Sequence, residues 1–182
     1  MRSLLFALLL VLGVPNQAAA ASQWQVDHKA SRLGFVATQS GRFEGQFNRF
    51  TADMRFASDD LANSGFAVEI DVTSIDTGSQ KRDRELPKSS WFNFDAFPKA
   101  YYRAETIRQT NAGYEAVGEL TIRDNTHPVT LPFTWETTGD TARMNGEVVI
   151  DRIRYDIGQG DWADPSVVAH DVRVVVDLTL TR

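Results

Sequence analysis

Apolar and polar residues alternate with a period of two along most of this chain. In the stretch 172–180 every even position is Val or Leu, while three of the four odd positions are Arg, Asp or Thr. Successive side chains of a strand point to opposite faces, so this pattern predicts strands with one apolar and one solvated face, as in antiparallel sheets. It predicts eight of them, at about 31–38, 43–56, 66–73, 100–107, 114–123, 129–138, 142–151 and 172–181.

The stretch 43–56 changes phase partway along. Phe43 and Phe47 share one phase, and Phe50 and Phe56 share the other. A β-bulge near Asn48–Arg49 would cause such a slip and would bend the strand. Eight antiparallel strands with one apolar face close naturally into a barrel. We therefore expect an all-β fold, an eight-stranded antiparallel barrel, with one short helix at 79–86.

The first twenty residues have the pattern of a secretory signal peptide. Arg2 is followed by an apolar run from Leu4 to Val14, which is too short to span a bilayer because a spanning helix needs about 20 residues. Ala18–Ala20 offers the small residues of a cleavage site. We expect 1–20 to be a signal peptide and 21–182 a barrel domain exported to the periplasm without a stable membrane anchor. The alternative is a buried N-terminal helix.

Composition excludes several kinds of chemistry. The formal net charge of −5 argues against a nucleic-acid partner, which requires a basic surface. The chain has no Cys, and its three His residues show no metal-binding spacing. No nucleophile elbow or Walker loop is present. We therefore expect no catalytic residue, no metal and no cofactor, and we predict that the protein is not an enzyme.

Six aromatic residues fall within the twelve residues 91–102, interrupted by Asn93, Asp95 and Pro98. This density fits neither a regular strand nor a regular helix. The segment can close one end of the barrel, form the wall or lid of an apolar cavity, or do both. Small residues on the inward phase of the strands, such as Ala116 and Gly118, favour a cavity because they leave room inside the barrel.

An ordered set of motifs covers almost the whole chain after residue 20. Together these motifs resemble the YceI family of periplasmic lipid- and polyisoprenoid-binding proteins. The segment 73–78 (TSIDTG), followed by Arg82-Asp83 and Leu86, resembles the family's most specific signature. The other matching segments are 24–27 (WQVD), 41–47 (GRFEGQF), 91–98 (WFNFDAFP), 118–123 (GELTIR), 126–129 (THPV), 151–152 (DR), 157–162 (IGQGDW) and 171–172 (DV).

The resemblance implies an extended barrel of lipocalin type, with a long hydrophobic tunnel that holds an isoprenoid or a similar amphiphile. The tunnel candidates are the inward-phase residues of the strands, the aromatic segment and Leu86 on the short helix. As ligand-binding residues we predict Phe35, Phe47, Val68, Ile70, Leu86, Phe92, Phe94, Phe97, Tyr102, Leu120, Ile122, Phe133, Trp135, Ile150, Val174 and Val176.

The leading functional hypothesis is a periplasmic carrier that binds a polyisoprenoid, a quinone or another long-chain lipid. Two alternatives stay open: a lipid-modifying enzyme of the barrel cavity, and a stress-related structural or interaction protein with a packed barrel. A homodimer is compatible with the sequence. Each buried CH₂ contributes about 0.8 kcal/mol, so affinity should come from the tunnel lining. A phosphate head would need Lys81, Arg82 or Arg84 near the mouth.

Overall fold

The computed structural model describes residues 21–182, so the predicted signal peptide lies outside the described part of the chain. The first strand, β1, begins at Gln23, and the last strand, β11, ends at Thr181. No helix among the described residues is long and apolar enough to cross a membrane. The strands are β1 Gln23–Val26, β2 Arg32–Thr38, β3 Arg42–Phe47, β4 Phe50–Arg55, β5 Gly65–Asp71, β6 Ile75–Asp76, β7 Lys99–Thr110, β8 Gly113–Ile122, β9 Asn125–Thr138, β10 Thr141–Asp151 and β11 Asp171–Thr181.

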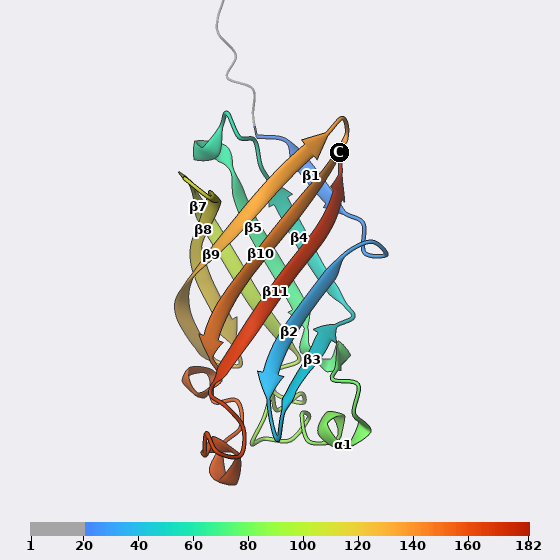
Figure 1. Ribbon diagram of the computed structural model, residues 1–182, viewed down its shortest axis with the longest axis vertical. Coiled ribbons are helices and arrows are strands. Elements are labelled where there is room, and N and C mark those ends of the chain that lie inside the picture. The colour runs from blue at the N-terminus through green and yellow to red at the C-terminus, as the bar shows by residue number, and fades with distance from the viewer. Residues whose placement is uncertain (1–20) are drawn as a thin grey trace, which may run out of the picture.

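Helical segments are short and lie between the strands. One α-helical turn, α1 Gln80–Asp83, falls within the predicted helical stretch 79–86 and continues as turns up to Trp91. The 3₁₀ segments are η1 Leu61–Asn63, η2 Val72–Ser74, η3 Arg152–Tyr155 and η4 Gly160–Ala163. Figure 1 shows α1 and the last two of these segments at the lower end of the barrel, whereas the C-terminus lies at the upper end.

All strand pairings are antiparallel, and they close the sheet on itself. The order runs β1-β4-β5-β7-β8-β9-β10-β11, and β1 pairs with β11 through Gln25↔Thr181 and Val26↔Leu180. β2 pairs further down the same β11, so β1 and β2 together occupy one place in the barrel wall. The expected all-β, eight-stranded barrel is confirmed. The short strands β1 and β6 were not expected from the alternation, because four residues and two residues are too few to display it.

The predicted phase slip at 48–49 is a break between two strands. β3 pairs with β2, and β4 pairs with β1 and β5, so the two halves of the stretch 43–56 occupy one bent place in the wall. The Arg49 N–H donates to Ser74 Oγ at 2.9 Å, and its side chain donates to Asp71 at 2.9 Å. These bonds satisfy the backbone where the ladder is interrupted.

A second irregularity, in β7, was not expected. The register of β7 against β8 shifts between Ala104 and Thr106, which is a β-bulge. Gly118 on β8 lies opposite Ala104, and a Cβ there would collide with the carbonyl oxygen of Arg103. Gly118 therefore permits the close approach of β7 at the bulge. It does not supply room for a ligand, contrary to the expectation from the sequence.

β9 forms a partial edge in the barrel wall. It pairs with β8 along most of its length, but it pairs with β10 only from Phe133 onward. Pro128 and Pro132 both lie in the part of β9 that pairs with β8 alone. Since Pro lacks a backbone N–H, it is tolerated in strands at such edges. A proline on a strand, such as Pro132, is expected at an edge or a bulge, and here it lies at the partial edge.

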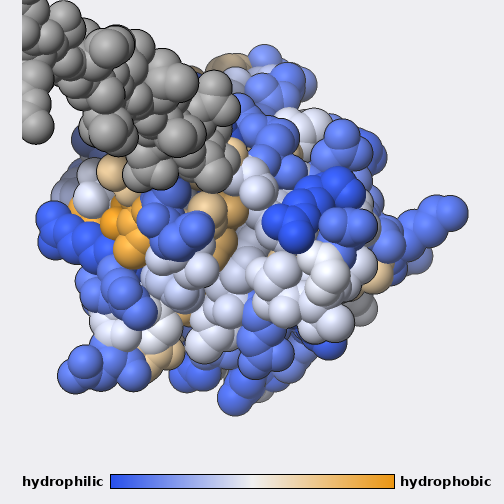
Figure 2. Space-filling model, turned by 90° about the horizontal axis from the view of Figure 1, so that it is seen from above, coloured by the Kyte–Doolittle hydropathy of each residue, from blue (hydrophilic) through white to orange (hydrophobic). Residues whose placement is uncertain are grey.

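The upper half of the barrel interior is filled by aromatic rings. We call this the aromatic cluster: Trp24, Phe56, Phe66, Tyr114, Phe133 and Trp135. Phe56 lies at its centre, 4.4 Å from the Trp135 ring and 5.0 Å from the Tyr114 ring, and is 2% exposed. Figure 2, which looks onto this end of the barrel, shows hydrophilic side chains over most of the visible surface and one hydrophobic patch.

Candidate functional site

The lower half of the barrel encloses a cavity of about 460 Å³. Its wall is formed by the inward-facing residues of β2, β3, β4, β5, β7, β8, β9, β10 and β11, together with residues of the segment 75–92. The inward faces carry Val, Ile, Leu and Phe, because these positions continue the apolar phase of the sequence alternation. The cavity therefore offers an apolar interior to a ligand.

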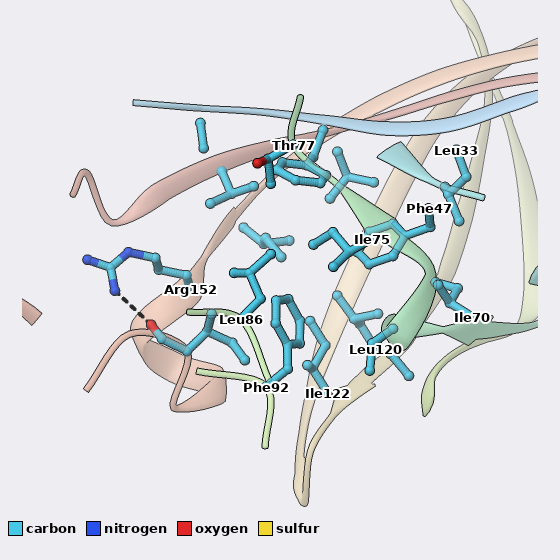
Figure 3. Close-up of a pocket in the computed structure, with 18 of the residues that line it drawn as sticks. Leu33, Phe47, Ile70, Ile75, Thr77, Leu86, Phe92, Leu120, Ile122 and Arg152 are labelled. Atoms are coloured by element: carbon cyan, nitrogen blue, oxygen red, sulfur yellow. Dashed lines mark hydrogen bonds between the residues drawn. The ribbon is translucent and has the colours of Figure 1, made fainter. Parts of the chain in front are cut away.

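Most of the ligand-binding candidates lie together around this cavity. Figure 3 shows Leu86 and Phe92, from the segment after α1, pointing toward the same space as Leu120 and Ile122 of β8. Their role in binding stays a prediction. The twelve candidates that line the cavity are Phe35, Phe47, Val68, Ile70, Leu86, Phe92, Tyr102, Leu120, Ile122, Ile150, Val174 and Val176.

The other four candidates lie outside the cavity wall. Phe133 and Trp135 have the inward phase, but they belong to the aromatic cluster, where facing rings fill the space. Phe94 packs against Phe92, with ring centroids 6.2 Å apart. The Phe97 ring lies 5.5 Å from the guanidinium of Arg123. The segment 91–98 therefore contributes Trp91 and Phe92 to the wall and uses its other aromatic rings as packing behind it.

Other residues on the same inward phases also line the cavity, although they were not among the predicted ligand-binding residues. They include Leu33 on β2, Met54 on β4, Phe66 on β5, Met144 on β10 and Leu178 on β11. Gly45 shows how the wall is shaped on β3, because a Cβ there would collide with the ring of Phe35. The period-two pattern carried the signal for all of them.

The mouth of the cavity lies between the β2–β3 turn and α1. Its lining there includes Gln39, Ser40, Ser79 and the exposed Lys81. The buried Thr77 anchors α1 to this end of the barrel. Its hydroxyl donates to Asp83 Oδ1 at 2.6 Å, and it accepts a bond from Arg82 Nε at 3.2 Å.

The side chain of Arg82 lies at the outer part of the mouth. The Arg82 guanidinium lies 4.0 Å from the centre of the Phe43 ring, an arrangement that favours a cation–π contact. Its Nη2 donates to the carbonyl oxygen of Thr77 at 2.8 Å. Glu85 also lines the mouth and pairs with Lys88 at 2.7 Å. The polar groups at this end can form hydrogen bonds or ion pairs with a ligand head, whereas the apolar side chains of the interior cannot.

Arg152 is a buried cation at the lower edge of the cavity, visible to one side of the lining residues in Figure 3. It is 3% exposed and donates to five backbone carbonyl oxygens, at distances between 2.6 and 3.1 Å. Burial lowers the pKa of its guanidinium. The acceptors belong to Ile157, Gly158, Trp162, Val168 and Ala169.

Arg152 therefore holds together the loops that follow β10. Aspartates flank Arg152 in the sequence, as at Asp151 and Asp156, and this favours a local ion pair; the structure differs, because all five N–H groups of Arg152 donate to backbone carbonyls. Its position predicted burial, since it continues the inward phase of Val148 and Ile150.

Two polar groups inside the lower half differ in how they are satisfied. The Tyr102 hydroxyl lies 2.8 Å from the carbonyl oxygen of Ala116 and 3.2 Å from that of Val129, and burial raises the pKa of its phenol. The indole N–H of Trp91 is buried and has no hydrogen-bond partner among the described residues. Within residues 21–182, no three His, Asp or Glu side chains lie close enough together to hold a metal ion.

Comparisons with known proteins agree with this architecture. The family model described as "YceI-like domain" matches residues 24–180. A UPF0312 protein of Yersinia enterocolitica is 33% identical over 119 residues, covering 63% of this chain and 62% of that protein. A UPF0312 protein of Yersinia pestis is 33% identical over 87 residues, covering 48% and 45%. The matched regions thus span about half the length of these curated relatives.

Solved structures share the fold over most of the chain. The crystal structure of BcnA from Burkholderia cenocepacia has a TM-score of 0.80 at 30% identity, covering 85% of this chain and 98% of that one. The Campylobacter jejuni YCEI protein has a TM-score of 0.69 at 16% identity, covering 76% and 84%. A structure described as a polyisoprenoid binding domain from Saccharophagus degradans has a TM-score of 0.65 at 15% identity, covering 87% and 97%.

Proposed function

Because this chain belongs to the YceI-like family, we propose that its barrel binds a long-chain amphiphilic lipid, such as a polyisoprenoid or a quinone. The protein would carry or store this lipid in the periplasm after removal of residues 1–20. The single observation that carries the proposal is the apolar cavity, whose mouth is lined by polar side chains. The name of the Saccharophagus degradans domain, which describes polyisoprenoid binding, is in keeping with it.

The cavity suits a tail better than a compact ligand. Its wall runs along β11 from Val172 to Leu178, so an extended chain meets apolar side chains along its whole length. Each buried CH₂ contributes about 0.8 kcal/mol, and four isoprene units exceed the lower range of the association cost of about 4–15 kcal/mol. An exposed ion pair at the head adds only about 0–1 kcal/mol.

The orientation follows from polarity. We place the tail in the interior and the head at the mouth, near Lys81, Arg82 and Glu85. A neutral, oxygen-bearing head matches these groups without requiring a high density of positive charge.

The cavity itself argues against the alternative of a packed barrel. For the alternative of a lipid-modifying enzyme, the titratable side chains of the cavity lining are Lys81, Arg82 and Glu85 at the mouth, Arg152 and Tyr102. Arg152 and Tyr102 are bonded to backbone carbonyls, which commits them to structure. A binding role therefore fits the lining better than acid–base chemistry does.

Native mass spectrometry tests this proposal. The protein is purified without detergent from the cell envelope of its own source, and masses are recorded before and after collisional release. We expect a chain that begins near Ala21 together with a released lipid at one copy per barrel. A bare chain mass from repeated preparations would contradict lipid binding, and a chain that retains Met1 would contradict export by a cleaved signal peptide.

A further inference from the structure

We propose that Met54, Phe66 and Met144 form a floor that sets the longest tail the barrel accepts. This inference rests on the proposed lipid-binding function. The three side chains line the cavity and are 1%, 3% and 1% exposed. On β4, β5 and β10 they are the last inward residues that touch the cavity before the aromatic cluster begins.

The strand register places each of these residues next to the aromatic cluster or within it. Met54 pairs with Phe66 across β4 and β5, and with Trp24 across β4 and β1. Met144 pairs with Trp135 on one side and with Leu178 on the other. The floor residues thus join two members of the aromatic cluster directly in the ladder, and Phe66 belongs to both groups.

The aromatic cluster supports the floor from behind. The Phe66 ring lies 5.3 Å from the Phe133 ring, and the Trp24 ring lies 5.4 Å from that of Trp135. Interiors packed in this way change shape only at a cost, so a tail cannot push the rings aside. A tail that reaches the floor must therefore stop there, and any further length has to leave through the mouth.

The depth of the cavity sets the expected tail length. On β11 the lining extends from Leu178 down to Val172, which at about 3.4 Å per residue gives roughly 20 Å of strand. A strand tilt of about 35–45° reduces this to roughly 15 Å along the barrel axis. An isoprene unit adds four chain bonds of about 1.5 Å, or roughly 5 Å when extended, so the interior holds about three units and a fourth reaches the mouth.

A series of linear prenols with 10, 15, 20, 25 and 30 carbons provides the test. The dissociation constant of each prenol for the chain 21–182 is measured by tryptophan fluorescence. We expect affinity to rise at least tenfold per unit up to 15 or 20 carbons, and less than threefold per unit beyond. An affinity that keeps rising tenfold per unit up to 30 carbons would overturn the floor while leaving lipid binding intact.

Three variants assign the limit to the named residues. Met144→Ala opens the floor and should move the plateau one unit longer. Val68→Phe fills space inside the existing cavity and should move it one unit shorter, without removing any core packing. Leu180→Ala is the matched control, since Leu180 is 0% exposed and does not line the cavity; its plateau should stay in place.

The outcomes separate the two levels of the proposal. Plateaus that stay at the wild-type length in both Met144→Ala and Val68→Phe overturn the floor. A shift in Leu180→Ala equal to that in Met144→Ala does the same, because it would reflect general loosening. If no prenol of any length binds the wild-type chain, the lipid-binding proposal fails together with the floor.

Discussion

The two halves of this barrel are built from the same strands with the same alternation, yet one is filled and the other hollow. In the upper half, inward positions carry Phe56, Phe133 and Trp135, whose rings meet across the barrel. In the lower half Phe35, Phe47 and Tyr102 lie in the wall among Val, Ile and Leu side chains, and a cavity of about 460 Å³ remains. What distinguishes the upper half is that its rings contact one another across the interior, with Phe56 at their centre.

The same contrast separates stability from binding. The upper half contains the pairings of β1 with β4 and of β1 with β11, which close the barrel where the sheet meets itself. The lower half leaves part of β9 without a partner on its β10 side and relies on the loops held by Arg152 instead. We therefore expect substitutions in the aromatic cluster to affect folding most, and substitutions of the apolar residues that line the cavity to affect ligand retention most.

The largest effect should come from the centre of the aromatic cluster. Phe56→Ala removes a ring that is 2% exposed and contacts four others. Burial and cavity formation predict a loss of about 3–5 kcal/mol in the free energy of unfolding. Urea denaturation measures it. A loss below that of a cavity-lining substitution would break the distinction between the two halves.

Arg152→Met should come second and should act on the loops. It leaves five carbonyl oxygens without their donor, and an unsatisfied buried group costs about 1–3 kcal/mol where water cannot replace the bond. We expect a loss of about 2–3 kcal/mol and faster proteolysis within 152–170. Arg154→Met is the control, because Arg154 is exposed two residues away. Equal effects in both variants would contradict the role given to Arg152.

A cavity-lining substitution should cost less stability and more binding. Ile122→Ala removes a half-buried side chain next to space that is already empty, so only part of its transfer free energy is lost, about 1 kcal/mol. Lipid retained per protein, measured after detergent-free purification, should fall. If unfolding free energy drops as much as in Phe56→Ala while lipid content is unchanged, Ile122 belongs to the packed core.

The smallest effect concerns pH at the break between β3 and β4. Hydrogen bonds from Thr73 and the Arg49 guanidinium hold the pKa of Asp71 below its usual range. A lowered pKa stabilises the fold above the unfolded pKa of about 3.9, and this contribution disappears as pH falls through the folded pKa. Because Asp71 is partly exposed, Asp71→Asn should cost only about 0.5 kcal/mol at pH 7.

The comparison of wild type with Asp71→Asn as a function of pH checks the sign. The difference in unfolding free energy should be constant from pH 7 to about pH 5 and should shrink below about pH 4. A difference that grows on acidification would show that the ionised carboxylate is not the stabilising form.

Much of the fold was predictable because one face of each strand contacts the apolar interior and the other face contacts water. The alternation located eight strands, and the slip at 48–49 located the break between β3 and β4. The bulge in β7 was not predictable from the sequence. Glu105 and Thr106 are two adjacent polar residues, and such a pair can mark a bulge or can simply be a polar residue at an inward position. The strand β1 is too short to display a period.

The site was predictable by direction but not by depth. Phase alone predicted that Ile122 and Phe133 both face inward, and both do. It could not tell that Phe133 meets facing rings while Ile122 meets space, because that depends on pairing between strands distant in sequence. The same limit applied to Arg152, whose hydrogen bonds go to backbone carbonyls and not to the aspartates beside it in the sequence.

Two pairs of tryptophans, one in each half, allow the central claim to be tested by one measurement. Trp91 and Trp162 lie 5.6 Å apart at the cavity's lower end, and Trp24 and Trp135 lie 5.4 Å apart in the aromatic cluster. Methyl stearate carrying a doxyl spin label at carbon 5 or carbon 16 is titrated into wild type and into the double variant Trp91→Phe/Trp162→Phe, and quenching of tryptophan fluorescence is recorded.

With the tail toward the floor and the head at the mouth, the carbon-5 label should quench wild type strongly and the double variant weakly. The carbon-16 label should quench the double variant more than the carbon-5 label does. It reaches the floor, and Trp24 and Trp135 lie directly behind the floor. Equal quenching by both labels in the double variant, or no quenching in wild type, would contradict a lipid tail held in the lower half of the barrel.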